Sequence, residues 1–286
     1  MRKFSIVLLS VLLLIVFVGC DLSVETMGKM GNNLAGTDKN YVASIIKQTE
    51  PEAAKKKDED GKITITGSNF SISTSEGKGS ISIGGKDVKV PSELQTAINK
   101  VLTDSEFSSI ILPTDISDIV LGVKSGSNSE IIKEELKKTA KDDSLKAAQG
   151  TVTLVNAMLD EVQKAVKDDD PEGGFDEVIK DIKGFLPDKG SITNGDVVVL
   201  TALSNIVFNE IVLSNVESIM EKPESPSDKD AQDKYDSAMK EVTGEMMNQF
   251  SSLLDVVTNV PSGMSNKIND FINDLMDSSN NKEKAE

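Results

Sequence analysis

Residues 195–222 read GDVVVLTALSNIVFNEIVLSNVESIMEK, and they form the longest apolar segment that follows the first twenty residues. As a helix, this segment would present Val, Leu, Ile, Phe and Met around much of its circumference. A helix that is apolar on most sides must be surrounded by protein, so we expect it to be the buried centre of the fold. Thr193 and Asn194 are suited to cap its start. A strand at residues 197–200, which begin with three valines, is the second interpretation.

Polar residues argue against a membrane-spanning role for the same segment. Three asparagines and two glutamates interrupt it, namely Asn205, Asn209, Glu210, Asn215 and Glu217. A single carboxylate at the centre of a bilayer costs about 2.5 kcal/mol or more. The segment therefore predicts a helix inside a protein core.

Amphipathic patterns elsewhere predict helices that pack around this centre. In residues 145–166, apolar side chains recur at alternating intervals of three and four, and Leu154 and Met158 widen the stripe beyond a coiled-coil seam. We therefore expect a bundle helix there, with an intermolecular coiled coil as the alternative. Similar patterns predict helices near residues 38–47, 92–102, 129–141, 175–185, 228–259 and 264–276.

Residues 62–90 have a different periodicity, because apolar and polar residues alternate there. A period of two is typical of strands with one buried face. Turn signals at residues 67–69, at residues 76–79 and at Gly84 and Gly85 divide the segment. We expect an antiparallel meander of three or four short strands, half covered by helices, since so small a sheet is not stable alone.

Weaker local signals fill the connections. Ser92 and Gln95 have the spacing of a capping box, and residues 104–113 suggest a short helical turn that Pro113 closes. Residues 115–123 are apolar and compatible with either a helix or a strand. The charged run at residues 52–60 is most simply a solvated loop.

These patterns predict the α+β class, mostly α. We expect a helical bundle of about six to eight helices with a small antiparallel β-meander near the N-terminus. A single domain would occupy residues 41–277, with the meander at 62–90 and helices at 92–277. Residues 20–40 would form a flexible tether, and residues 278–286 a disordered tail.

The first twenty residues, MRKFSIVLLSVLLLIVFVGC, have the organisation of a secretory signal. Arg2 and Lys3 precede an apolar stretch that runs to Val18 and ends in Gly19 and Cys20. The stretch is shorter than the roughly 20 apolar residues of a membrane-spanning helix, which favours a signal peptide, residues 1–19, that is removed.

This segment resembles the bacterial lipoprotein signal, in which a dedicated peptidase cleaves before a lipid-modified cysteine. Phe17 stands where the common pattern has Leu, as in the looser version that spirochaetes use. The resemblance implies that Cys20 carries diacylglycerol and fatty acids such as palmitate. It also implies a lipid-anchored location in the cell envelope of a diderm bacterium, at the periplasmic face or the outer surface.

Composition restricts the chemistry of the mature chain. The sequence has no histidine, and Cys20 is its single cysteine, which excludes imidazole or thiolate metal sites, Ser-His triads, cysteine nucleophiles and disulfides. Cleavage would remove Arg2 and Lys3, leaving 29 basic residues against 47 acidic ones, a net charge of −18. Such a charge repels nucleic acid and anionic lipid surfaces. We expect a protein that is not an enzyme and needs no cofactor.

Two acidic clusters raise the question of calcium. Residues 168–174 place a glycine correctly for an EF-hand loop, but Ile179 stands where a bidentate glutamate is needed. The second cluster, Asp228, Asp230, Asp233 and Asp236, fits a helix N-terminus, where carboxylates suit the helix dipole. We therefore predict no metal site.

The leading hypothesis for function is a lipid-anchored, non-enzymatic envelope protein whose acidic helical domain contacts envelope or host proteins. The alternative is a membrane-interacting lipoprotein, or one that binds a lipid or fatty acid, through an amphipathic helix. Its candidate contacts are Met264, Ile268, Phe271, Ile272 and Leu275. A carboxylate hydrolase or a solute-binding protein is a third possibility, for which the sequence shows no aromatic-lined acidic pair and no parallel α/β lobes.

Overall fold

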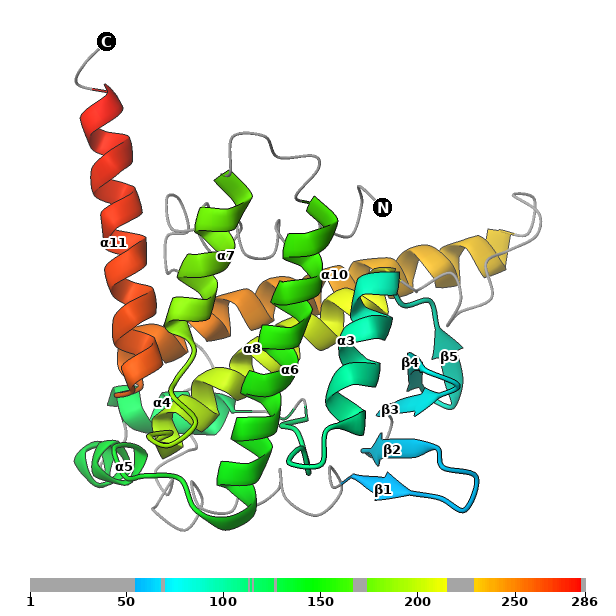
Figure 1. The fold of residues 1–286 in the computed structure, drawn as a ribbon. Coiled ribbons are helices and arrows are strands. Elements are labelled where there is room, and N and C mark those ends of the chain that lie inside the picture. The colour runs from blue at the N-terminus through cyan, green and yellow to red at the C-terminus, as the bar shows by residue number, and fades with distance from the viewer. Residues whose placement is uncertain are drawn as a thin grey trace.

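Helices make up most of the fold, and a small sheet lies on one side of them (Figure 1). The computed structural model describes residues 55–67, 70–112, 114, 116–125, 128–166, 174–214 and 229–283. The signal peptide, the tether, the helix expected at residues 38–47 and most of the acidic loop at 168–174 lie outside these residues. Within them, the predicted class of α+β, mostly α, with an antiparallel sheet near the N-terminus is confirmed.

The described helices number eight, within the range that the sequence predicts. They are α3 (Ser92–Thr103), α4 (Ser117–Ser125), α5 (Ser129–Leu136), α6 (Asp142–Val166), α7 (Gly174–Phe185), α8 (Asn194–Ser214), α10 (Lys229–Asn259) and α11 (Gly263–Glu283). No helix among the described residues combines the length and the apolar character needed to cross a membrane.

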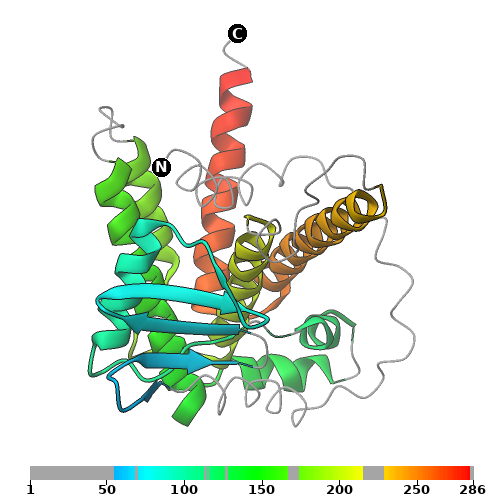
Figure 2. The same ribbon diagram turned by 90° about the vertical axis from the view of Figure 1, so that its right-hand side faces the viewer.

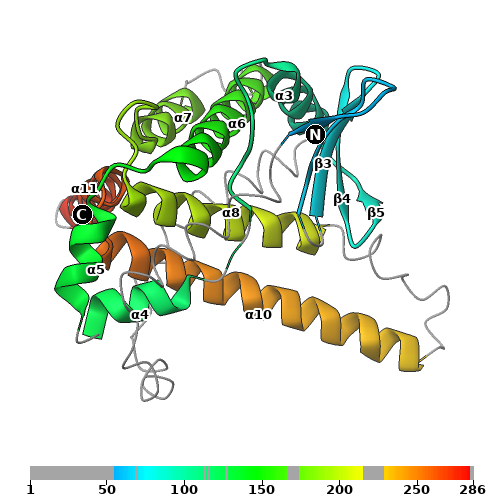
Figure 3. The same cartoon turned by 90° about the horizontal axis from the view of Figure 1, so that it is seen from below.

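α8 is the buried centre, as its sequence predicts. Val197, Val199 and Leu200 are at most 1% exposed, and the helix lies between α6 and α10 (Figure 3). The strand interpretation of residues 197–200 is wrong, because a helix places these side chains on several sides at once and all sides are covered. Residues 215–222 of the predicted helix lie outside the described part.

The sheet is a five-stranded antiparallel meander in the order of the chain. Its strands are β1 (Lys56–Lys57), β2 (Ile63–Thr66), β3 (Phe70–Ser75), β4 (Lys78–Ile83) and β5 (Lys86–Val88). Gly84 and Gly85 both have positive φ, which the tight β4–β5 hairpin requires. β1 lies in the charged run expected to be a loop, because pairing with β2 needs only backbone groups.

The buried face of the sheet packs against α3 and the second half of α8. Ile65, Ile72 and Ile81 are paired across neighbouring strands and are at most 5% exposed. Beside them, Phe70 meets Phe208 of α8 edge to face, with ring centroids 5.4 Å apart. α6 and α8 contribute side chains both to the apolar cluster under the sheet and to the core between the helices. These two long helices therefore connect the two clusters.

The structure corrects the cap of α3 and the end of α11, and it decides one ambiguous stretch. α3 begins after Pro91 without a side-chain cap, because Ser92 is already the first helical residue and Gln95 donates instead to the carbonyl of Val90. The stretch at 115–123, compatible with either a helix or a strand, overlaps α4, which begins at Ser117 and extends to Ser125. α11 runs to Glu283, past the tail expected from residue 278, since no Pro or Gly follows Gly263.

Residues 104–112 are the largest departure from expectation, since they form an irregular segment and not a helical turn. Side chains of the long helices bind both backbone polar groups of Ile111 within this segment, and the backbone N–H of Lys55 donates to the carbonyl of Ser108. The amide of Ile111 donates to Thr151 of α6 (2.8 Å), and its carbonyl accepts from Ser204 of α8 (3.2 Å). Just beyond, Asn205 exchanges two hydrogen bonds with the backbone of Thr114. Buried irregular backbone is stable only with such partners.

This segment lies directly on α6 at Gly150. A Cβ atom at position 150 would stand 1.7 Å from the carbonyl oxygen of Ser109. Only glycine therefore allows the backbone of residues 107–112 to reach the helix, and Phe107, Ile110 and Ile111 are buried as a result.

We predict that Gly150→Ala lowers the free energy of unfolding by about 1–3 kcal/mol, because the added methyl group forces backbone apart in a packed core. Gly244→Ala is the matched control: its Cβ meets nothing within 4 Å, and alanine should raise stability by up to about 1 kcal/mol. Urea unfolding followed by circular dichroism measures both. Equal stabilisation by the two substitutions would contradict the close contact at Gly150.

Candidate functional site

α11 carries the five residues that the sequence marks for membrane or lipid contact. Met264 and Ile268 lie in its first two turns and are 1% and 5% exposed in the helical core. Ile272 is half-buried against the same core. The half-buried Phe271 has its ring 5.0 Å from that of Phe185 on α7. Leu275 lies further along α11, and its side chain is outside the described part.

The structure thus brings four of the five candidates together against protein. α7, α8 and α10 all contact α11, and together they cover its apolar face near the N-terminal end. Contact of Met264 and Ile268 with lipid therefore requires α11 to leave the core.

The N-terminus of α11 is fixed by a buried carboxylate. Asp196 of α8 is 2% exposed, and its Oδ1 accepts a hydrogen bond from the backbone N–H of Met264 (3.0 Å). Its Oδ2 accepts from the backbone N–H and the hydroxyl of Thr193, and the N–H of Asp196 donates back to that hydroxyl. One side chain therefore caps two helices, and its negative charge suits both dipoles.

The two helix ends approach closely around this carboxylate. A Cβ at Gly195 would meet the carbonyl oxygen of Pro261 at 2.4 Å. Ser262 caps α11 by accepting from the N–H of Ser265 (2.9 Å). Further along, the Asn269 side chain donates to the carbonyl of Val257. α11 is thus held by polar contacts as well as by its apolar face.

The sequence reveals only part of this arrangement. Of the two predicted caps, Thr193 does cap α8, whereas the Asn194 side chain donates to the carbonyl of Glu135. Thr193 and Asp196 have the spacing of a capping box, a local signal that could have identified the carboxylate. The contact from Asp196 to Met264 spans 68 positions, and no local pattern predicts it.

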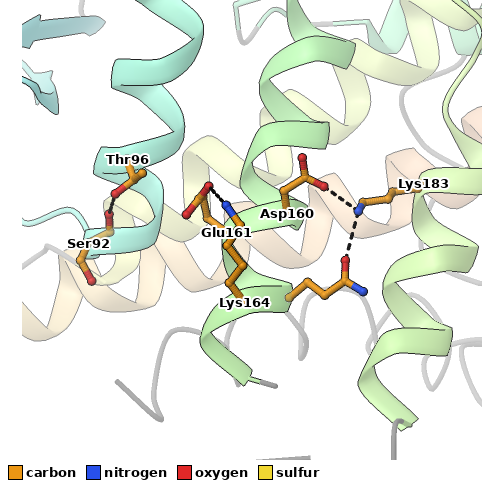
Figure 4. A network of polar contacts seen from close by, with 7 residues as sticks. Ser92, Thr96, Asp160, Glu161, Lys164 and Lys183 are labelled. Carbon is orange, nitrogen blue, oxygen red and sulfur yellow. Dashed lines mark hydrogen bonds and ion pairs between the residues drawn. The ribbon is translucent and has the colours of Figure 1, made fainter. Parts of the chain in front are cut away.

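The ion pairs of the described residues lie at the surface or between neighbouring helices. Lys183 of α7 reaches Asp160 of α6 at 2.7 Å and also donates to Gln163 (Figure 4). Lys124 of α4 reaches Asp255 of α10 at 2.8 Å. Such pairs align helices and contribute little stability each when exposed.

The shifted pKa values have the same structural origin. A hydrogen bond to Lys137 lowers the pKa of Glu134, and the reciprocal bond raises the pKa of Lys137. Hydrogen bonds to Asp143 and Glu161 raise the pKa values of Lys146 and Lys164. Each partner is three residues away, and all of them except the partly buried Glu161 are exposed. These shifts therefore describe local pairs, and a raised pKa keeps each of the three lysines charged.

Other predicted features fall in part outside the described chain. Cys20 and Asp228 of the second acidic cluster lie outside the described residues. Asp230, Asp233 and Asp236 of that cluster lie in the first turns of α10. Among the described residues, no group of three Asp, Glu, His or Cys side chains is placed to hold a metal ion. No protein-family model, curated protein or solved structure matches the chain.

We predict that Asp196→Ala lowers the free energy of unfolding by about 3 kcal/mol, because it removes a cap and leaves the buried Met264 N–H without an acceptor. Asp143→Ala is the control: it removes an acidic residue from the first turn of another helix, but one that is exposed. Thermal or urea unfolding should find the control close to the unsubstituted protein. Equal effects of the two substitutions would contradict the double-cap role.

Proposed function

We propose that this protein is a lipid-anchored, non-enzymatic component of the cell envelope, held at a membrane through Cys20, with an acidic helical domain that contacts other proteins. The observation that carries the proposal is the sequence of residues 1–20, with its basic start, short apolar stretch and terminal Gly-Cys. Cleavage before Cys20 would leave residues 20–286, which include every residue that the structure describes. A folded domain therefore follows the anchor.

The buried polar groups support a structural role for the helical domain. Asp196 caps two helices, Asn205 binds the backbone of Thr114, and Thr151 binds the backbone of Ile111. Each of these side chains is thus used in holding the fold together. Residues 105–286 have a net charge of −17, and this charge suits contacts with basic partners and keeps the domain soluble.

We predict that Cys20→Ala abolishes incorporation of labelled palmitate and leaves the protein as an uncleaved or released precursor. Cys20 is the single cysteine of the chain, so label on any other thiol is excluded. Ser23→Ala, three residues later, is the control and should incorporate label normally. Metabolic labelling followed by fractionation of membranes measures both. Unchanged incorporation in Cys20→Ala would refute the anchor.

The alternative, a lipid-contacting α11, requires removal of Met264 and Ile268 from the core and loss of the bond from Met264 to Asp196. Departure of α11 would also expose to water the apolar side chains of α7, α8 and α10 that it covers, at a cost of about 1.5–3 kcal/mol for each large side chain uncovered. We therefore infer that α11 stays packed when the domain meets a lipid surface.

We accordingly predict that the Cys20→Ala chain, when it is produced from residue 20 to residue 286 without the signal peptide and so carries no lipid, remains in the soluble fraction when it is floated with phosphatidylcholine vesicles at neutral and at mildly acidic pH. Asp196→Ala in the same background is the comparison, because it weakens the attachment of α11. If that helix entered lipid, a larger fraction of this variant would float. Flotation of the Cys20→Ala chain itself would favour the alternative function.

A further inference from the structure

We propose that the outer face of the sheet is the surface that this protein turns toward a bilayer bearing anionic headgroups. The outer face is the side of the sheet opposite α3. By cross-strand pairing it carries hydroxyl residues in two rows, with Thr64, Ser73 and Ser80 in one and Thr66, Ser71 and Ser82 in the other, and Asp87 of β5 continues the second row. That a bilayer is the partner of this face rests on the proposed lipid anchor at Cys20.

The outer face is open and polar. Figure 2 shows it turned toward the viewer, with no described helix in front of it. Thr66 is exposed, most of the other hydroxyl residues are half-exposed, and Ser73 is buried between its neighbours with a hydrogen bond to Ser80. Short hydroxyl side chains make a flat surface that both donates and accepts hydrogen bonds, as phosphate and glycerol groups of lipid headgroups require.

Among the described elements, the sheet is also the one nearest to Cys20 in the sequence. Thirty-five residues, from Cys20 to Ala54, precede Lys55, where the described fold begins just before β1. Even fully extended, a chain of that length reaches at most about 120 Å. Such a connection keeps the sheet at high local concentration beside the membrane, so a weak contact suffices to orient the domain.

Charge is distributed unevenly along the sequence. Residues 55–104, which hold the sheet and α3, contain eight lysines and seven carboxylates, a net charge of +1. Residues 105–286 contain 18 lysines and 35 carboxylates, a net charge of −17. An anionic leaflet repels the second part strongly and the first part hardly at all. The orientation is therefore decided mainly by which part of the molecule the surface repels.

Lysines at the rim of the outer face strengthen this preference. Lys56 pairs with Thr64, and Lys78 pairs with Ser75, and both lysine side chains are exposed.

Carboxylates oppose these lysines: Asp58, Glu59 and Asp60 lie in the β1–β2 turn, Glu76 lies in the β3–β4 turn, and Asp87 lies on the outer face beside Ser82. Asp87 is engaged by the hydroxyl of Ser82. The N-terminal half of α10 extends on the same side of the molecule, with Asp233 and Asp236 exposed, and should tilt away from the surface (Figure 3).

The test couples the chain from Cys20 to Glu286, which contains every described residue, to vesicles that carry a maleimide lipid. Because Cys20 is the single thiol, the thioether forms there alone, and attachment does not depend on lipidation in the cell. The vesicle experiment therefore tests the orientation even if labelling in cells shows that Cys20 carries no lipid. Lysine acetylation by a soluble ester, read out by mass spectrometry, then compares individual side chains on free and coupled protein.

We expect acetylation of Lys56 and Lys78 to slow about threefold or more on vesicles of phosphatidylcholine and phosphatidylglycerol in a roughly 7:3 ratio. Lys137 at the end of α5, on the far side of the molecule, Lys180 on α7 and Lys234 on α10 should react as in the free protein (Figure 1). The protection should decrease in salt of about 0.5 M, where charge is screened over a few ångströms.

Lys56→Glu combined with Lys78→Glu should remove most of the protection at Lys62, which directly precedes β2 on the same side. The matched control, Lys137→Glu combined with Lys180→Glu, changes the net charge equally and should leave that protection intact. The proposal is overturned by equal reactivity of all lysines on free and coupled protein, by protection of Lys137 or Lys234 in place of the sheet, or by equal protection on vesicles of phosphatidylcholine alone.

Discussion

A helix that is apolar around most of its circumference has to be covered on every side, and the described structure is organised around covering α8. α6 and α10 lie along opposite sides of it, the sheet packs on its second half, and α11 packs near its start. Two buried polar side chains of α8 attach covering elements. Asp196 binds the first turn of α11, and Asn205 binds the backbone before α4. Apolar burial supplies the driving force, and these bonds fix which neighbour sits where.

Much of this arrangement could be predicted from the sequence, because periodicity reports burial directly. The stripe of α6, the alternation in β2 to β4 and the all-round apolar character of α8 predicted the element types correctly. Failures occurred where tertiary partners replace local ones. Residues 104–112 have helix-compatible residues, yet Gly150, Thr151 and Ser204 on two distant helices offer their backbone a better set of contacts. The double cap by Asp196 was missed for the same reason, since its second partner lies 68 positions away.

For the candidate site, the sequence predicts which residues share a face of α11 but not what that face contacts. Amphipathic periodicity marks Met264, Ile268, Phe271 and Ile272 as one face of a helix, but a face that packs on a core and a face that enters lipid have the same pattern. In the structure this face lies against α7, α8 and α10. The charge is also uneven along the sequence, with a net charge of +1 in residues 55–104 and −17 in residues 105–286.

An acidic domain of this kind stays at an anionic membrane only if a covalent anchor holds it there, so the lipid on Cys20 is the central claim. A single acyl chain gives only marginal attachment, and the claim therefore requires several. Intact-mass spectrometry of the protein extracted from membranes of the cells that produce it tests this most directly. We expect a chain that begins at Cys20 and carries the added mass of a diacylglyceryl group and a further acyl group. A chain that begins at Met1, or one that begins at Cys20 without added mass, would contradict the claim.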